Sequence, residues 1–439
     1  MTNRMRFLCV TILAVCSLPA QTAKDRHVVL VSLDGFPAYA LRNPLIPLPA
    51  LRRMIQQGAS ADGMETVNPS VTWPNHTSMV TGVTPAVHGV LFNGLAVRGG
   101  EGKPLHVEPW IDKAELVNAP TVYDLAHAAR LTTAEVDWVA IHKARTITWS
   151  FAEQPRVEGA VEREMVASGL VSESDLRSFA KAPITWRDEI WTRAAIHILE
   201  RHRPNLLLFH LLTTDSVQHR HGADSLAGNT ALILADRQVQ RILDSLKTSG
   251  LEQKTTVIVV SDHGFKTYKR VIRPNAILSA NGLIENAWVI PEGGTAMVYV
   301  TRSANREQTV EKMKGLFSKA QGIAEVIGPD RFAELGYPSP VKNNRMADLV
   351  LAAAPGYSFE GATQGDAVAD VPANSTPGAH GYLSTDPEMN AIFIAWGAGI
   401  KPGAKLGPIR NLDVAPTIAR LLGLEMPATA GRVLTGALR

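Results

Sequence analysis

Three aspartates each follow a short apolar run, and two of them have a histidine close by. Asp34 follows VVLVSL, Asp215 follows NLLLFHLL, and Asp262 follows TVIVV with His263 next to it. Aspartate and histidine supply the oxygen and nitrogen ligands that a zinc-like ion binds. One aspartate after a strand is usually a turn residue or a helix cap. Three of them, two accompanied by histidines, predict a metal site.

Two further histidines extend the candidate ligand set. His219 lies four residues after Asp215, a spacing that places both on one face of a helix. His380 has glycines on both sides, and their mobile backbone lets a distant ligand reach the same site. Taken alone, a capping aspartate with a solvated histidine explains the first pair more simply. His88 and His221 are interpreted as structural.

A threonine at a predicted helix start is the candidate nucleophile. Thr72 precedes Trp73 and Pro74, and proline is favoured in the first turn of a helix. Backbone N–H groups at a helix start favour an anion. A threonine hydroxyl is a poor nucleophile unless a base or a metal lowers its pKa. Two metals would do so, one at the alkoxide and one at a water or leaving oxygen. On its own, Thr72 is more simply a helix N-cap.

For these residues to form one site, the strands that precede them must end at the same edge of a sheet. Short apolar runs alternate with amphipathic segments along the chain, a pattern typical of an α/β fold with a largely parallel sheet. Ligands of such sheets bind beyond the carboxyl ends of the strands. The predicted strands are 27–33, 134–140, 205–212, 256–260, 347–352 and 391–395. The predicted helices are 48–57, 121–129, 186–202, 229–248, 305–319 and 412–422.

Length and composition favour one large globular domain with an insertion. The chain has 439 residues, 45% hydrophobic and 19% charged, which is enough for a sizeable core. The net charge of +3 disfavours an electrostatic binder of nucleic acid or membrane. The turn-rich pieces PEGG and GYPSP lie in the region 266–343, which is predicted to be a smaller subdomain inserted in the main sheet.

The first 23 residues have the layout of a secretory signal peptide. Two arginines precede an apolar run, and small residues follow it. The chain's two cysteines, Cys9 and Cys16, both lie in this segment, so the catalytic domain predicted over 24–439 must build a metal site without thiolates. A secreted or periplasmic location is expected, with a lipoprotein anchored at Cys16 as the weaker alternative. No later stretch is long and apolar enough to span a bilayer.

Several motifs, in this order, resemble the type I phosphodiesterase/nucleotide pyrophosphatase family of the alkaline phosphatase superfamily. They are VSLDGF, TWPNHTSMVTGVTPAVHGVLFN, DSVQH, SDHGF and GAHGY. The tail NLDVAPTIARLLGLEMPATAGRVL is similar to the last helix and closing turn of the superfamily. The resemblance runs from Val29 to Gly431. It implies an alkaline-phosphatase-like three-layer sandwich and hydrolysis of phosphodiester or pyrophosphate bonds.

The resemblance also implies roles for single residues. It implies two divalent ions, zinc above all, and a covalent phospho-threonine intermediate. One ion would be held by Asp34, Thr72, Asp262 and His263, and the other by Asp215, His219 and His380. Thr72 would be the nucleophile, and Asn93 would donate its side-chain amide to a phosphoryl oxygen. A small phosphate ester is the implied substrate, without nucleic acid as a stable partner.

Departures from the family pattern keep other functions open. Nucleotide-cleaving members tend to carry a base-stacking tyrosine five residues before the first ligand, where this chain has His210, which argues against a nucleotide. Trp73 would stack a flat leaving group or belong to the core. Lys143 and Arg145 resemble the Lys-x-Arg pair of threonine-nucleophile phosphate monoesterases, or are solvated. The alternatives are a monoesterase, a phosphonoacetate-hydrolase-like enzyme, and a non-enzymatic, metal-dependent protein that binds phosphorylated ligands.

Overall fold

A central eight-stranded sheet carries the residues singled out above. The computed structural model describes residues 25–427 and 429–439, so the predicted signal peptide over 1–23 lies outside the described residues. The strand order is β20-β2-β19-β9-β1-β8-β6-β7. In that order the strands are Ala404–Lys405, Ala59–Ser60, Phe393–Gly397, Thr255–Val260, His27–Leu33, Leu206–Leu211, Thr133–Val136 and Trp149–Phe151. The five strands from β9 to β7 are parallel and β19 is antiparallel, which confirms the predicted α/β class.

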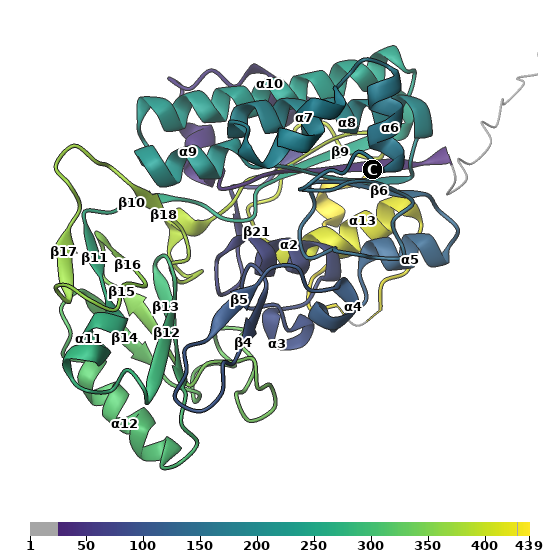
Figure 1. Cartoon of the computed structure of the whole chain (residues 1–439). Coiled ribbons are helices and arrows are strands. Elements are labelled where there is room, and N and C mark those ends of the chain that lie inside the picture. The colour runs from purple at the N-terminus through teal and green to yellow at the C-terminus, as the bar shows by residue number, and fades with distance from the viewer. Residues whose placement is uncertain (1–24, 428) are drawn as a thin grey trace, which may run out of the picture.

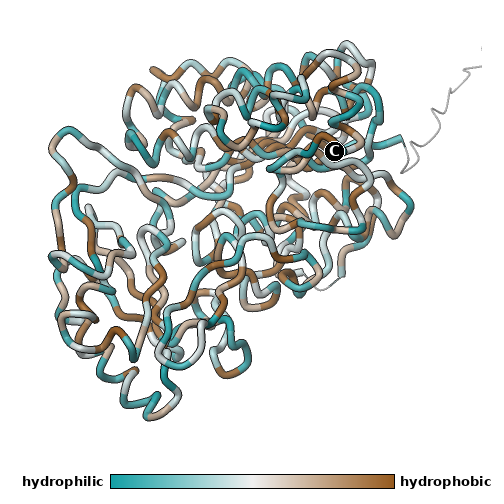
Figure 2. Tube along the Cα trace, viewed as in Figure 1, coloured by the Kyte–Doolittle hydropathy of each residue, from teal (hydrophilic) through white to brown (hydrophobic). Residues whose placement is uncertain are grey.

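Helices cover both faces of this sheet (Figure 1). One face carries α1 (Pro49–Gln57), α6 (Ala160–Ala167), α7 (Glu173–Ser178), α8 (Ile184–His202) and α10 (Leu226–Thr248), and the other carries α2 (Thr72–Thr81), α5 (Val122–Ala128) and α13 (Val414–Leu422). Along β1, Val29, Val31 and Leu33 pack toward the first set, and Val28 and Leu30 toward the second. Apolar residues therefore gather along the sheet between the layers (Figure 2). Burial on both faces explains the unbroken apolar runs of the sequence.

The predicted elements agree with the structure apart from two strands. All six predicted helices are present, with ends within three residues of the predicted ends. The strand predicted at 134–140 ends at Val136, because Asp137 takes a left-handed backbone conformation with φ 56°. The strand predicted at 347–352 is β15 (Leu349–Ala353), which lies in a different sheet. The shorter helices are α3 (Pro85–His88), α4 (Lys113–Leu116), α9 (Thr213–His221) and α11 (Pro274–Ala280).

A second unit of strands lies beside the main sheet, at the lower left of Figure 1. Its four-stranded sheet has the order β12 (Ala287–Glu292), β13 (Thr295–Val300), β15, β14 (Ile323–Ile327), and its three-stranded sheet has β16 (Tyr357–Phe359), β11 (Arg270–Ile272), β17 (Val368–Asp370). Helix α12 (Arg306–Phe317) packs Met313 and Phe317 on one face. The other face packs Met297 and Tyr299 against Phe92. The predicted insert at 266–343 stops before β15 to β17, and a separate domain here stays a prediction.

Three small two-stranded sheets complete the fold. They pair β10 (Lys266–Thr267) with β18 (Gly378–Ala379), β21 (Pro408–Arg410) with β3 (Gly63–Glu65), and β4 (Leu95–Val97) with β5 (His106–Glu108). The first of them matters for the site, because β18 leads directly into His380. Pairing with β10, which follows the SDHGF segment, brings His380 back to the edge of the main sheet although it lies more than a hundred residues later.

Because of Glu135 in β6, we predict that the free energy of unfolding of the protein depends on pH. The side chain of Glu135 is buried and accepts hydrogen bonds from the Ser150 hydroxyl and the Trp138 backbone N–H. Burial raises the pKa of Glu135 to about 7. The folded protein thus holds this proton more tightly than the unfolded chain does. The free energy of unfolding should fall as pH rises from about 4.5 to 7, by at most about 1.4 kcal/mol per pH unit.

Glu135→Gln should remove this part of the pH dependence, because glutamine is neutral and still has an acceptor for Trp138 and a donor for Ser150. Urea unfolding at pH 5 and pH 8 measures the effect. Glu307→Gln, on an exposed position of α12, is the control and should leave the difference between the two pH values unchanged. An identical difference in wild type and Glu135→Gln would show that Glu135 ionises normally.

Candidate active site

Three neighbouring strands bring the predicted aspartates together. Strand β1 lies between β9 and β8, with Leu33 opposite Leu211 and Ser32 opposite Val260, so the carboxyl ends of all three strands reach the same edge. The aspartates that follow these ends are Asp34, Asp215 and Asp262. Ordinary parallel register therefore places three carboxylates at one point, as the sequence predicted.

Asp34, Asp262 and His263 form a fully buried group. His263 Nε2 lies 3.4 Å from Asp34 Oδ1 and 3.2 Å from Asp262 Oδ2. Among the residues that the structure describes, these three buried atoms have no hydrogen-bond partner. The second oxygen of each carboxylate is held, since His210 contacts Asp34 Oδ2 at 2.9 Å and the Gly35 N–H donates to Asp262 Oδ1 at 3.0 Å. Buried polar atoms that converge without partners fit a bound cation.

Asp215, His219 and His380 form an adjoining group. Asp215 Oδ1 has no hydrogen-bond partner within the described part of the chain and lies 3.2 Å from His219 Nε2 and 3.7 Å from His380 Nε2. The ligand atoms of Asp215, His263 and His380 lie within 4.8 Å of one another. The rings of His263 and His380 stack with their centroids 3.7 Å apart. His263 thus adjoins both groups, and the two groups fit a centre with two ions side by side.

Backbone carbonyls set the orientation of the three histidines. Each turns its Nδ1 to a carbonyl oxygen at 3.1 Å, from Gly378 for His219, Gly264 for His263 and Ser70 for His380. A carbonyl only accepts, so Nδ1 carries the proton and Nε2 presents its lone pair to the aspartates. Burial lowers the pKa of His263 to about 4 and lowers that of His380 as well. Both therefore stay neutral near pH 7, the form that binds metals.

The carboxylates of the site repel one another. Burial, followed by the charges of Asp262 and Asp215, raises the pKa of Asp34 well above its ordinary value. Buried like charges are costly unless a cation compensates them. Together with the unpartnered atoms, this repulsion indicates that the donor set suits divalent ions. The donors are carboxylate oxygens and imidazole nitrogens without thiolates, a set that zinc accepts.

Thr72 opens α2 beside these carboxylates. The backbone N–H of Trp73 donates to Asn93 Oδ1 at 2.9 Å. Because an N–H only donates, this contact fixes the amide oxygen and leaves Asn93 Nδ2 free to donate elsewhere. His76 ties the first turn of the helix to the metal ligands, since its Nδ1 lies 2.9 Å from the Thr72 carbonyl and 3.6 Å from Asp262 Oδ2. The helix start is thus anchored at the candidate metal centre.

The other predicted substrate residues lie nearer the surface. Trp73 is partly buried and packs against the same apolar cluster as Ile111. Lys143 is 66% exposed, and its Nζ lies 2.9 Å from Asp112 Oδ1. Arg145 is exposed. The charge of Lys143 is therefore shared with a neighbouring carboxylate, which makes it a weaker partner for a phosphate dianion.

His210 is not at a substrate-facing position. Its side chain is 2% exposed and lies between two buried carboxylates in the sheet. A side chain at this position faces Asp34 and Asp137 in the interior of the sheet, so the histidine found here in place of a tyrosine is no evidence against a nucleotide. Of the two histidines interpreted as structural, His88 is fully buried with its Nε2 3.0 Å from the Ser78 hydroxyl, and His221 is exposed. His76 was missed, although its position four residues after Thr72 places both on one face of α2.

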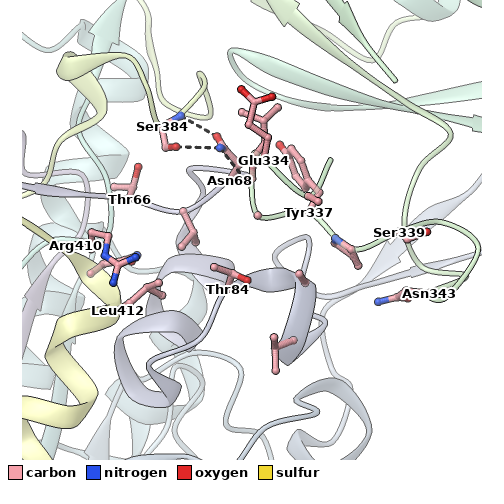
Figure 3. Close-up of a pocket in the computed structure, with 18 of the residues that line it drawn as sticks. Thr66, Asn68, Thr84, Glu334, Tyr337, Ser339, Asn343, Ser384, Arg410 and Leu412 are labelled. Atoms are coloured by element: carbon pink, nitrogen blue, oxygen red, sulfur yellow. Dashed lines mark hydrogen bonds between the residues drawn. The ribbon is translucent and has the colours of Figure 1, made fainter. Parts of the chain in front are cut away.

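Two other features are separate from this site. A cavity of about 920 Å³ opens between α3 and the loop at 333–345, and Asn68 and Ser384 bond across its wall (Figure 3). None of the predicted ligands lines it. His197 and His202 each contact Glu164 Oε2 at 2.8 Å. These are ordinary hydrogen-bond distances and none of these ring nitrogens or carboxylate oxygens is buried without a partner, so the trio is complete without an ion.

Most of the sequence matches one known family. The model of that family, type I phosphodiesterase/nucleotide pyrophosphatase, matches residues 28–383. The chain belongs to this family. Its members are metal-dependent hydrolases that cleave phosphodiester and pyrophosphate bonds, so the chain is an enzyme of this class. The matched range contains every predicted ligand and the candidate nucleophile. The family suggested by the motifs is thereby confirmed.

Relatives within the family match nearly the whole chain. Ectonucleotide pyrophosphatase/phosphodiesterase family member 7 of Mus musculus is 23% identical over 95% of this chain and 88% of its own. A bis(5′-adenosyl)-triphosphatase of Xenopus laevis is 24% identical over 90% and 78%. The solved structure of human ectonucleotide pyrophosphatase/phosphodiesterase 5 has a TM-score of 0.71 at 19% identity, covering 92% of this chain and 97% of that chain. The murine protein, as an inactive form in complex with AMP, gives 0.72. The predicted alkaline-phosphatase-like fold is confirmed.

We predict that a glycine at position 381 is needed to keep His380 in place. The φ of Gly381 is +76°, and an added Cβ would lie 1.6 Å from the Glu292 carbonyl oxygen at the tip of the β12–β13 hairpin. The same tip donates the Gly294 N–H to the His380 carbonyl at 2.9 Å. Gly381→Ala should displace His380 and lower both zinc affinity and hydrolysis by about 10- to 100-fold. Zinc content by mass spectrometry and turnover of an aryl phosphodiester measure this.

Gly356→Ala is the matched control for this prediction. Gly356 also has a left-handed backbone, with φ +82°, but nothing lies within 4 Å of an added Cβ. It should therefore bear the same backbone strain without affecting zinc or turnover. Equal losses in both variants would mean that the strain alone, rather than the displacement of His380, causes the effect.

Proposed function

We propose that this enzyme hydrolyses phosphodiester or pyrophosphate bonds with two divalent ions, zinc above all, through a phospho-threonine at Thr72. One observation carries the proposal: buried, unpartnered atoms from the ends of three adjacent strands converge, and His76 links them to the first turn of α2. Family membership supports the bond type. The metal count, the intermediate and the roles of single residues are the further steps of this proposal.

The two ions would be held by two adjoining ligand groups. One group is Asp34, Thr72, Asp262 and His263, and the other is Asp215, His219 and His380. When bound, the ions supply positive charge that lowers the pKa of the Thr72 hydroxyl and offsets charge on the phosphoryl oxygens. The residues fit this role because each group offers carboxylate oxygens and imidazole nitrogens with no thiolate, the donors that zinc binds.

The side chains of the site would carry out two displacements at phosphorus. The Thr72 hydroxyl gives its proton to water and its Oγ1 forms a bond to phosphorus while the bond to the leaving oxygen breaks, and the leaving group takes a proton from water. Asn93 Nδ2 donates to a non-bridging oxygen, because its Oδ1 is already occupied by the Trp73 N–H. Water then attacks the phospho-threonine from the opposite side. The bond from phosphorus to Oγ1 breaks, Thr72 regains its proton, and a phosphate monoester leaves.

A small phosphate ester is the proposed substrate, and a nucleotide fits it. Relatives are named for nucleotide substrates, and the murine relative binds AMP. His210, which stands in place of the family's tyrosine, is buried and offers no surface on which a base could stack. Trp73 lies next to Thr72, is partly exposed and would stack a flat leaving group. Nucleic acid is not proposed as a stable partner.

Export from the cytoplasm is part of the proposal. The predicted signal peptide over 1–23 supports export, and the exported protein would be secreted or periplasmic. The Mus musculus relative also bears the name of an ectoenzyme. In the part of the chain that the structure describes, no helix is long and apolar enough to cross a membrane. N-terminal sequencing of the exported protein tests the proposal, and a product beginning at residue 1 would contradict it. A lipid on Cys16 would appear in the mass of the exported protein.

Zinc-dependent turnover tests the proposed reaction. Protein stripped with a chelator and reloaded with zinc should hydrolyse an aryl phosphodiester, and the stripped protein should not. If the protein is instead a monoesterase, it should prefer an aryl monoester. If it is a phosphonoacetate-hydrolase-like enzyme, it should cleave phosphonoacetate. A protein that binds zinc and phosphate tightly but turns over none of the three substrates would be the non-enzymatic binding protein.

Lys143→Ala separates the diesterase from the monoesterase. Because Lys143 is 66% exposed and paired with Asp112, its loss should change turnover of either aryl substrate by less than about fivefold. The ratio of kcat/KM for an aryl diester to that for an aryl monoester is measured, with Arg145→Ala alongside. A large loss confined to the monoester would establish the Lys-x-Arg role and the monoesterase function.

A further inference from the structure

A buried histidine–aspartate pair lies directly behind the candidate ligand Asp34. His210 Nε2 is 2.9 Å from Asp34 Oδ2, and His210 Nδ1 is 3.0 Å from the Asp137 carbonyl and 3.1 Å from Asp137 Oδ2. The three side chains are exposed by 2%, 0% and 1%. We propose that His210 and Asp137 are positioning residues that fix Asp34 as a metal ligand. This inference rests on the metal centre of the proposed function.

The two oxygens of Asp34 have different surroundings. Oδ1 faces His263 Nε2 at 3.4 Å and has no hydrogen-bond partner. Oδ2 is bound by His210. A carboxyl group rotates in a broad torsional well, so a hydrogen bond to one oxygen is what gives the other a fixed direction. His210 thereby holds Oδ1 toward the place where the unpartnered atoms meet, and it does so without occupying that place.

Asp137 in turn sets the orientation of the His210 ring. The oxygen of Asp34 that faces Nε2 is an acceptor, so Nε2 carries a proton. On the other side, Nδ1 is hydrogen-bonded to the Asp137 backbone carbonyl. The Asp137 carboxylate lies 3.1 Å from the same nitrogen without hydrogen-bond geometry, so it acts on the ring through its charge. The ring also packs edge-on against His76, with centroids 4.7 Å apart. With both nitrogens engaged and one edge packed, the imidazole has one orientation, and its donor points at Asp34.

The backbone at Asp137 is shaped for this contact. Strand β6 stops one residue earlier, and Asp137 has a left-handed φ of 56° while its N–H donates to the Phe151 carbonyl at 3.0 Å. Aspartate and asparagine tolerate this conformation better than other residues with a side chain. Unfavourable backbone conformations that a fold retains gather at functional sites. Here the turn places the Asp137 carboxylate against His210, between neighbouring strands β6 and β8.

Hydrogen-bonded residues behind a ligand usually raise metal affinity by about 10- to 100-fold. His210→Phe keeps a ring of similar volume but has no donor, so zinc affinity at the Asp34 site should fall by about that factor. Competition with a chromogenic chelator measures the affinity, and the visible spectrum of the cobalt-substituted protein should change. His210→Gln, whose amide N–H still donates, should recover part of the loss. Asp137→Asn keeps the backbone preference and the carbonyl, and should give an intermediate loss.

A matched histidine separates this role from a purely structural one. His27 is also buried, with its Nδ1 2.8 Å from the Pro204 carbonyl, but it lies at the opposite end of β1. His27→Phe should leave zinc affinity unchanged. If His210→Phe lowers only the unfolding temperature of the zinc-free protein and binds zinc like wild type, the proposal is overturned. Should His210→Phe not fold, His210→Gln and Asp137→Asn decide, and wild-type zinc affinity in both overturns it.

Asp34→Asn distinguishes failure of this inference from failure of the metal centre. If Asp34→Asn loses one zinc ion while His210→Phe binds both with wild-type affinity, the centre is right and the positioning role is wrong. If Asp34→Asn itself binds two zinc ions like wild type, Asp34 is not a ligand and the proposed centre fails. Loss of affinity in Asp34→Asn and His210→Phe, with recovery in His210→Gln, is the result we expect.

Discussion

Replacing Thr72 with alanine is expected to abolish turnover of an aryl phosphodiester while the fold and most of the zinc binding persist. Removing a catalytic nucleophile lowers kcat by about 10⁴-fold or more in enzymes that act through covalent intermediates. The fold should tolerate the change, because the contact of Thr72 with His76 uses its backbone carbonyl rather than its hydroxyl. Asp34, Asp262 and His263 would still offer ligand atoms to the adjoining ion.

Thr72→Ser is the matched control, since serine keeps an Oγ at the same place. It should retain turnover within about tenfold, because a hydroxyl nucleophile is still present. Acid quenching during turnover of a ³²P-labelled substrate should trap a labelled peptide in wild type and none in Thr72→Ala. Wild-type turnover in Thr72→Ala would exclude Thr72 as the nucleophile. Reduced turnover without a labelled peptide in wild type would instead favour direct attack by water.

The parts of this site that depend on single strands could be predicted from the sequence. The run before Asp34 is apolar throughout because β1 is buried on both faces, and a polar residue that ends such a run stands at the edge of the sheet. The same reasoning located Asp215 and Asp262. The division of the candidate ligands into two groups came only from the resemblance. No contact between distant segments was needed for these steps.

The contacts between strands that are not consecutive could not be predicted. His210 contacts Asp137 because β8 lies between β1 and β6 in the sheet. The order of the strands in a sheet cannot be predicted from the residues of any one strand. For the same reason, an apolar run identified β15 as a strand but not the sheet to which it belongs. Strand β6 ends early because Asp137 has a left-handed backbone conformation, which the neighbouring residues in the sequence do not predict. The resemblance identified His210 only as the residue that stands in place of a tyrosine, and not as a neighbour of Asp34.

Asp215→Asn is expected to remove one of the two proposed zinc ions and to lower turnover by at least about 10³-fold. Asp215 Oδ1 is the oxygen nearest to both His219 and His380 in the second ligand group. Burial alone would raise the pKa of Asp215, but His219 and His380 more than offset this, so it is a carboxylate before any ion binds. Asparagine has nearly the same shape without the charge, so the loss should come from ligation rather than packing.

Zinc content, turnover and zinc-induced stabilisation together measure the effect of Asp215→Asn. An ion that binds only the folded state raises the unfolding temperature, so the rise on adding zinc should be smaller than in wild type. Asp224→Asn, exposed three residues after the end of the same helix, should change none of the three. Two zinc ions with wild-type turnover in Asp215→Asn would exclude Asp215 as a ligand. One zinc ion with unimpaired turnover would be more informative, because it would leave the chemistry to the Asp34 group and reduce the second ion to a structural role.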